Sequence, residues 1–341
     1  MQIQELEVKK EKTNNVTFID RASGIPLIGS VFIGILDRGS SLLQVRATTI
    51  CNMNCAFCST DAGITSKFHK NNFIIEPNYL IGELKRISEL KGYNLHYNID
   101  SVGEPSSYPY LIELIKGISE INDVVKISMQ TNGTLLNKKL VDGLEMAGLN
   151  RLNVSVHSLD SLKAKMLFGS ENYHVEKVVE MLKYIKNTKI DLWITPVWIP
   201  NINDNDIKEL VKFAKENSFN IALQKYETYQ YSRKMKKAKK INYWKFYKQL
   251  QDWEKEFGIK LKFTEEDPTI VRRKSLPIVF DINEKVQGVV VCNGWFENQV
   301  IAKARDRCIT VNKCNSNIGD KINLKIVQNS NNIYIADLIR K

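Results

Sequence analysis

Apolar and polar positions alternate with two different spacings between residues 42 and 227. Six short runs rich in apolar and β-branched residues are typical of strands, and they lie at 42–50, 95–101, 124–129, 151–157, 190–198 and 219–227. Amphipathic segments with helical spacing separate these runs, near 78–90, 108–119, 136–147, up to about 187 and near 205–216. The alternation predicts an α/β fold, a partial (β/α)6 TIM-like barrel of parallel strands with functional groups at their carboxyl ends.

The sequence pattern changes after about residue 276. Short β-prone runs are separated there by Asn, Gly, Asp and Lys turns, and these runs are PIVFDI, QGVVVC, QVIAKA, CITV, DKINLKIV and NNIYIADLI. They predict a small C-terminal antiparallel β-barrel. Three parts are therefore expected: an N-terminal extension at 1–41, a core at 42–263 that includes a basic linker and a helix, and the barrel at 276–341.

Composition places the chain among ordinary globular proteins, with 43% hydrophobic and 26% charged residues. No apolar run is long enough to cross a bilayer, and the first residues, MQIQELEVKKEKTNN, are charged where a secretory signal needs an apolar region. A cytoplasmic protein with no membrane contact is expected. Six cysteines are too few for a disulfide scaffold, so reduced thiols are expected, with Cys292, Cys308 and Cys314 free and buried.

A formal net charge of +11 would attract polyanions. Much of this charge lies in residues 226–240, where three tyrosines are interleaved with six cations, and the aromatic INYWKFY follows at 241–247. Cations follow phosphates and aromatic faces stack on bases, so the stretch is typical of an RNA-binding segment. The alternative is a solvated loop before an amphipathic helix whose buried stripe includes Trp244 and Tyr247.

Three cysteines, Cys51, Cys55 and Cys58, lie in the sequence CNMNCAFC, which we call the cysteine loop (51–58). Three soft thiolates suit an iron-sulfur cube that keeps one corner without a protein ligand. The alternatives are structural zinc, which would need a distant fourth ligand, and buried unreactive thiols.

The Cys-x3-Cys-x2-Cys spacing of this loop, with Phe57 before the third cysteine and a predicted strand before the first, resembles the signature of the radical S-adenosylmethionine (SAM) superfamily. The resemblance implies a [4Fe-4S] cluster on Cys51, Cys55 and Cys58, with SAM binding the free iron through its amino and carboxylate groups. It also implies an external electron donor of the ferredoxin or flavodoxin type. One electron then cleaves SAM to a 5′-deoxyadenosyl radical, which takes a hydrogen atom from the substrate.

The same resemblance implies SAM contacts at the ends of three later strands. DSVGEP at 100–105 is similar to the family's Gly-Gly-Glu segment, and SMQTNG at 128–133 resembles its Thr-Asn-Gly turn; the implied contacts are Gly103, Glu104, Thr131, Asn132, Asn153 and Ser155. A Gly-Pro turn and a helix cap are the structural alternatives for these two segments. His157, at the end of the 151–157 run, is the candidate catalytic residue, to relay a proton or contact substrate; a satisfied interior histidine is its alternative.

Residues 276–341 are similar to TRAM domains, small barrels attached to several RNA-modifying enzymes. This resemblance implies an RNA-binding surface that includes Trp295, Arg305 and Arg307, whereas a lid or a dimer contact is the structural alternative. Taken together, the chain resembles an archaeal group of radical SAM proteins that carry such a tail. The expected function is modification of tRNA or another RNA; the alternatives are modification or maturation of a peptide or protein, and a non-catalytic RNA-binding metalloprotein.

Overall fold

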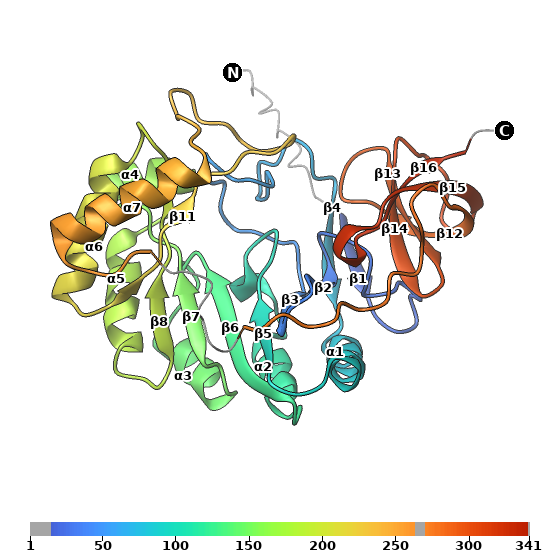
Figure 1. Ribbon diagram of the computed structural model, residues 1–341, viewed down its shortest axis with the longest axis horizontal. Coiled ribbons are helices and arrows are strands. Elements are labelled where there is room, and N and C mark those ends of the chain that lie inside the picture. Colours follow the sequence, from blue (N-terminus) through green and yellow to red (C-terminus); the bar gives the residue numbers. More distant parts are fainter. Residues whose placement is uncertain (1–14, 263–269, 340–341) are drawn as a thin grey trace, which may run out of the picture.

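The computed structural model describes residues 15–262 and 270–339, and Figure 1 shows a curved sheet flanked by helices beside a small barrel. The sheet has seven strands in the order β10-β8-β7-β6-β5-β3-β2. Their bounds are Gly34–Asp37 (β2), Leu42–Arg46 (β3), Leu95–Ile99 (β5), Val124–Thr131 (β6), Arg151–Val154 (β7), Asp191–Ile194 (β8) and Asn220–Ile221 (β10). All neighbours pair in parallel except β2, which is antiparallel to β3. The six parallel strands confirm the predicted partial (β/α)6 barrel.

Seven α-helices connect these strands within the described residues. They are Pro77–Lys91 (α1), Leu111–Ser119 (α2), Lys138–Met146 (α3), Ser161–Phe168 (α4), Val175–Ile185 (α5), Asp204–Glu216 (α6) and Tyr243–Phe257 (α7). Local chemistry sets their ends: the Asn137 side chain accepts a hydrogen bond from the backbone N–H of Leu140 and so caps α3, and Gly258 ends α7 in the left-handed conformation. Each helix buries one apolar stripe against the sheet or a neighbouring helix.

The apolar stripe of α7 differs from the expectation. Phe246, Leu250, Trp253 and Phe257 are buried, whereas Trp244 is 66% exposed and Tyr247 is 38% exposed. The buried residues recur at four, seven and eleven positions, which is one face of a helix. Trp244 and Tyr247 therefore do not form the buried stripe.

Residues 15–41 pack into the core of the molecule. The strand β1 (Asn15–Ile19) pairs in parallel with β4 (Asn71–Ile75), and β2 extends the main sheet. Ile25, Leu27 and Phe32 are each almost completely buried. These three residues belong to the same hydrophobic core as Trp295 and Cys308 of the C-terminal barrel, and Figure 1 shows β1 and β2 between β3 and that barrel.

The C-terminal barrel is closed by five strands in the order β12-β13-β14-β16-β15. Their bounds are Lys285–Asn293 (β12), Gln299–Ala304 (β13), Arg307–Asn312 (β14), Lys321–Gln328 (β15) and Ile335–Leu338 (β16). The predicted barrel is confirmed, but its pairing is mixed because β14 and β16 run in parallel. The run PIVFDI at 277–282 forms no strand; instead its Phe280 packs into the barrel core.

The barrel and the sheet share a hydrophobic core. Backbone hydrogen bonds join Cys308 to Ile28 (2.8 Å) and Tyr334 to Gly29 (3.0 Å), and a Cβ at Gly29 would lie 2.1 Å from the carbonyl oxygen of Cys308. Trp295 is only 4% exposed and belongs to the main core. Removing the barrel would therefore expose apolar surface of the sheet.

Two of the three residues expected on the surface of the barrel are buried, namely Trp295 and Arg307. Their burial follows from the shared core, which takes up one face of the barrel. Only Arg305 is exposed, and it forms a 2.5 Å ion pair with Glu284. No helix within the described residues is long and apolar enough to span a membrane.

Candidate functional site

A cavity of about 720 Å³ opens at the carboxyl ends of the parallel strands. The sheet contributes residues that follow β5, β6, β7, β8 and β10, and the cysteine loop contributes the residues that follow β3. Parallel strands place their carboxyl ends at one edge, so residues far apart in the sequence meet there. The volume lies within the range of small-molecule sites, toward its upper end, so a cosubstrate and part of a substrate fit together.

All three thiols of the cysteine loop line this cavity. The loop turns tightly, with the Cys58 N–H donating to the Cys55 carbonyl (3.1 Å), and it is held against the end of α4. The N–H groups of Asn54 and Ala56 donate to carbonyls of α4, at 3.0 Å and 2.9 Å. Gly169 ends α4 with φ +61°, and a Cβ there would lie 2.0 Å from the Asn54 carbonyl oxygen. Only glycine permits this contact.

The chemistry of these thiols fits an iron-sulfur cluster. Burial raises the pKa of the Cys51 thiol to about 12, and burial together with the neighbouring thiols raises the pKa of Cys55. Such thiols become thiolates only when a bound cation offsets the cost of a buried charge. A cube takes three thiolates around one face rather than at one point, because each binds its own iron. The three cysteines, on one loop and facing one cavity, meet that requirement.

Glu104 lies on the cavity wall at the end of the loop that follows β5, and only 2% of its surface is exposed. Its Oε1 accepts from Ser106 (backbone N–H, 2.9 Å, and Oγ, 2.6 Å) and from Thr131 Oγ1 (2.7 Å). Its Oε2 accepts only the N–H of Asn132, at 2.7 Å. Burial raises the pKa of this carboxyl group, and it forms no ion pair among the residues of the described ranges. A buried carboxylate with an open acceptor position fits the ammonium of SAM.

Thr131 and Asn132 end β6 and also line the cavity. The Thr131 hydroxyl donates to Glu104, and the Asn132 side chain donates to Asn52 Oδ1 of the cysteine loop at 2.9 Å. The two residues thus link the cysteine loop to Glu104. They do not cap α3, because Asn137 does so.

Gly103 and Ser155 line the cavity, whereas Asn153 is not among the described residues that do. A Cβ at Gly103 would lie 2.3 Å from the Ile50 carbonyl oxygen and 2.4 Å from that of Thr49. The close approach at Gly103 is therefore to the backbone before the cysteine loop. Asn153 lies on β7 two residues before Ser155, so it is deeper in the barrel by about 7 Å.

His157 lines the cavity and is 3% exposed. Its Nδ1 accepts the backbone N–H of Val197 at 3.0 Å, so the ring proton of the neutral form is on Nε2. The ring stacks on Phe168, with centroids 4.9 Å apart, and meets the edge of Phe57 at 4.8 Å. Burial lowers the pKa of His157 to about 3, so the side chain is neutral near pH 7.

The lowered pKa of His157 predicts that the stability of the fold depends on pH. The unfolded chain binds a proton near the ordinary pKa of 6.5, and the folded chain does not until far lower pH. The unfolded state then holds more protons, so the free energy of unfolding falls as pH drops below about 6.5. At about pH 5 the loss from His157 is about 2 kcal/mol. Urea unfolding of the cluster-free chain at about pH 7.5 and pH 5 measures it.

The natural chain is compared with His157→Gln. Between about pH 7.5 and pH 5, the free energy of unfolding of this variant should fall by about 2 kcal/mol less than that of the natural chain. His69, whose pKa burial lowers to about 4, keeps its own contribution in both proteins. His174→Gln is the matched control because His174 is exposed. Equal pH dependence in the natural chain and His157→Gln would contradict the expectation.

Several cavity residues were not anticipated from the sequence. Arg46 lies in β3, and its Nε donates to Asp100 at 3.0 Å inside the barrel. A charged residue within an otherwise apolar run was the available signal. Trp295 and Phe296, from the loop between β12 and β13, form an aromatic wall with Tyr231, whose ring centroid lies 4.4 Å from that of Phe296. No local pattern indicates that this loop reaches the cavity.

The model of the radical SAM superfamily matches residues 45–214. The chain is 38% identical over 342 aligned positions to an uncharacterized protein, MJ0103, of Methanocaldococcus jannaschii, which covers 92% of this chain and 79% of that protein. It is 30% identical over 186 residues to the GTP 3′,8-cyclase of Alkaliphilus metalliredigens, and 29% over 180 residues to that of Aquifex aeolicus. These two alignments cover 54% and 53% of this chain and about half of each cyclase, 55% and 54%.

Solved structures with a similar fold include SuiB of Streptococcus suis bound to S-adenosylmethionine. It has a TM-score of 0.49 and 21% identity, over 65% of this chain and 49% of that chain. The structure of TYW1 with a lysine-pyruvate adduct has a TM-score of 0.47 and 22% identity, over 71% of this chain and 82% of that chain.

Proposed function

We propose that this chain, which belongs to the radical SAM superfamily, is an RNA-modifying member whose substrate is a nucleotide of tRNA or another RNA. Its [4Fe-4S] cluster and SAM, when bound, supply an organic radical that takes a hydrogen atom from the substrate. An external one-electron reductant is required. The observation that carries the RNA proposal is a basic aromatic surface that is continuous with the rim of the cavity.

Within the site, we assign the three cysteines to the cluster and Glu104 to the SAM ammonium. The SAM side of the cavity is completed by Gly103, Thr131, Asn132 and Ser155. Asn153 lies deeper in the barrel, behind this part of the wall. Neutral His157 carries its ring proton on Nε2 and can offer it to a bound molecule at the cavity wall. It does not act as a cationic acid, because protonation of its buried ring is unfavourable near pH 7.

The basic aromatic surface is formed by the segment after β11 (Gln224–Lys225) and by the first turns of α7. Its exposed members are Tyr229, Lys234, Lys236, Lys237, Lys239, Lys240, Tyr243, Trp244, Lys245, Tyr247 and Lys248. Within it, Lys248 lies 5.2 Å from the ring centroid of Trp244, and Lys225 lies 4.6 Å from that of Tyr243. Cations held beside exposed rings suit a chain of phosphates and bases.

The surface leads directly into the cavity. Tyr229, Gln230 and Tyr231 belong to the same segment as the lysines and line the cavity. An RNA strand bound along the surface would thus deliver one unstacked base to the aromatic wall of Tyr231 and Phe296. The exposed aromatic residues support binding rather than folding, because Trp244 contributes little buried area.

The topology of the barrel also supports the proposal. Its first strand neighbours the second and fourth, and its third strand pairs in parallel with the fifth. This is the strand order of the small Greek-key barrels that bind oligonucleotides. The TRAM-like assignment rests on this analogy of fold, whereas the RNA assignment rests on the surface and the cavity.

The test is binding of total tRNA by the cluster-loaded chain at several salt concentrations. Replacing Lys236, Lys237 and Lys240 with glutamine is expected to weaken binding at least tenfold and to lower the salt slope by about 2, since each phosphate contact contributes about 0.7 for single strands. Trp244→Ala is expected to cost about 1–3 kcal/mol if one base stacks there. Mass spectrometry of nucleosides from tRNA incubated with the reduced enzyme and SAM reads out the modification.

The matched control replaces Lys116, Lys139 and Lys177, which are exposed on α2, α3 and α5, and lowers the net charge equally. Equal weakening by the two triple variants would show that overall charge, and not this surface, binds RNA. Salt-insensitive binding, or no new nucleoside in any tRNA, would instead favour a peptide or a free nucleotide as the substrate.

A further inference from the structure

Arg233 is the first cation of the basic segment, but its side chain does not join the exposed surface. It lies against the cysteine loop and is 17% exposed. Its backbone N–H donates to the Cys58 carbonyl at 2.9 Å, and its Nη1 donates to the Cys55 carbonyl at 3.2 Å. The preceding Ser232 donates through Oγ to the Ser59 carbonyl at 2.8 Å. Two consecutive residues thus bind the loop that carries the metal-binding thiols.

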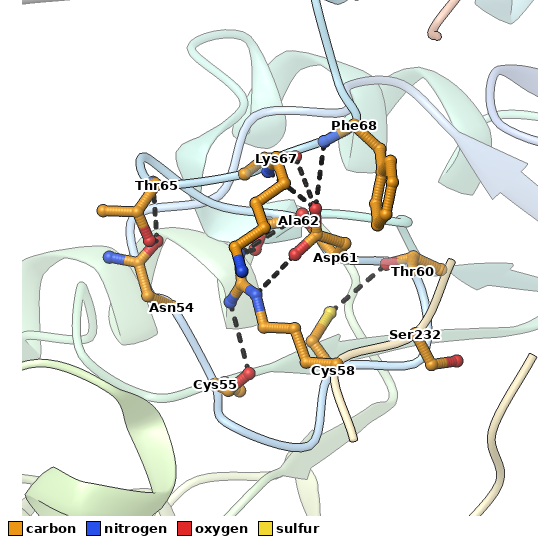
Figure 2. Close-up of polar contacts among 12 residues, drawn as sticks. Asn54, Cys55, Cys58, Thr60, Asp61, Ala62, Thr65, Lys67, Phe68 and Ser232 are labelled. Atoms are coloured by element: carbon orange, nitrogen blue, oxygen red, sulfur yellow. Dashed lines mark hydrogen bonds and ion pairs between the residues drawn. The ribbon is translucent and has the colours of Figure 1, made fainter. Parts of the chain in front are cut away.

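Asp61 fixes the orientation of the Arg233 guanidinium. Arg233 Nε donates to Asp61 Oδ1 at 2.6 Å, and Nη2 donates to the carbonyl oxygens of Asp61 and Ala62 at 3.3 Å and 2.8 Å. The other oxygen of Asp61 accepts from Ser66 and from the backbone N–H groups of Lys67 and Phe68. Figure 2 shows Cys55, Cys58, Asp61 and Ala62 around this set of contacts. The rigid fork of arginine makes all these bonds at once, which an ammonium cannot do.

We propose that Arg233 is a positioning residue that fixes the cysteine loop and makes the reduction potential of the bound cluster less negative. The proposal rests on the superfamily assignment, and not on RNA as the substrate.

Reduction changes the charge of the cluster site. One electron from the external donor enters the cluster, no bond changes, and the site gains one negative charge. A fixed positive charge beside the thiolates stabilises the more negative, reduced form. Asp61 offsets part of this effect, but the guanidinium lies between Asp61 and the Cys55 carbonyl, so the positive end of the pair faces the loop.

Arg233 also holds two backbone carbonyl groups of the cysteine loop in place. The carbonyl oxygen of Cys58 accepts the Arg233 N–H and that of Cys55 accepts its guanidinium as well as the Cys58 N–H. With these oxygens held outward, toward Arg233, the backbone of the loop has fewer ways to rearrange. The thiols then stay turned to the cavity when no cluster is bound.

The experiment compares the reconstituted, cluster-loaded natural chain with Arg233→Gln and Arg233→Lys by anaerobic potentiometry followed with electron paramagnetic resonance. Glutamine removes the charge, and the ratio of reduced to oxidised cluster at a fixed potential is expected to fall about three- to tenfold, tenfold being about 59 mV for one electron. Lysine keeps the charge without the fork, so its potential is expected to lie between the other two. Arg305→Gln is the matched control, because Arg305 also binds a carbonyl and a carboxylate, in the remote barrel.

An Arg233→Gln protein with full iron content and an unchanged potential would overturn the proposal. If that variant holds too little iron for titration, iron and sulfide content are compared with those of Arg233→Lys. Recovery of iron by lysine supports the role of the charge, and low iron in both variants supports the role of the guanidinium fork, whereas equally low iron in Arg305→Gln would overturn both. Binding of tRNA is measured on the same samples, so that failure of the RNA proposal is seen separately.

Discussion

Replacing Cys55 with alanine is expected to abolish both the brown absorbance of the cluster and the cleavage of SAM. Cys55 is the middle ligand of the loop, and its carbonyl anchors both Cys58 and Arg233. Two thiolates alone leave two irons of the cube without protein ligands, so the cluster is not retained. Iron and sulfide content, the visible spectrum and 5′-deoxyadenosine formation after anaerobic reconstitution measure the result.

Cys314→Ala is the control for this experiment. Cys314 is buried in the barrel core, so the variant also loses a buried thiol but keeps the cysteine loop intact. It is expected to retain iron and SAM cleavage. A Cys55→Ala protein with a full complement of iron that still cleaves SAM would remove the basis of the functional assignment.

Glu104→Gln is expected to weaken SAM binding by about ten- to a hundredfold, because a charge-assisted hydrogen bond to the ammonium is worth about 1.5–3 kcal/mol. The amide also has to place its NH2 group at one of the two carboxylate positions, and donors already occupy both: Thr131 and Ser106 at Oε1 and Asn132 at Oε2. The change therefore also disturbs either the hydrogen bonds from Ser106 and Thr131 or the one from Asn132. The SAM-induced change in the spectrum of the reduced cluster, followed as SAM is added, gives the affinity.

Glu113→Gln is the matched control, since Glu113 is exposed on α2. It should bind SAM as the natural chain does. Circular dichroism separates loss of binding from loss of fold in the Glu104 variant. Unchanged SAM affinity in a folded Glu104→Gln protein would show that the ammonium binds elsewhere.

The sheet was predictable because its strands are short runs of apolar and β-branched residues that alternate with amphipathic helices. Even there, the long runs at 190–198 and 219–227 hid breaks: β8 stops at Ile194, and Val197–Trp198 (β9) pairs separately with β11. The role of residues 15–41 could not be predicted, since β1 pairs with the distant β4 and β2 is only a four-residue edge strand beside β3.

In the candidate site, too, some residues could be predicted from the sequence and others could not. The cysteines, Glu104 and Thr131 were identified because their motifs are local and follow strand ends, where a parallel sheet gathers polar groups. The aromatic wall was missed because Trp295 lies about two hundred residues beyond the loop that it covers. Its neighbour His69, at a centroid distance of 3.6 Å, belongs to a loop with no recognisable pattern. Long-range packing of this kind leaves no periodic signal in a single chain.

Through the loop between β12 and β13, the C-terminal barrel contributes part of the wall of the cavity that also holds the three cysteines. The Asn71 side chain donates to the Gly294 carbonyl of this loop at 2.6 Å, which helps to fix its aromatic residues at the cavity wall. Two proteins with the same cysteine loop but different tails would accordingly present different walls to their substrates. Substrate choice in such proteins would be inherited with the tail, and exchanging that single loop would be the smallest change able to redirect it.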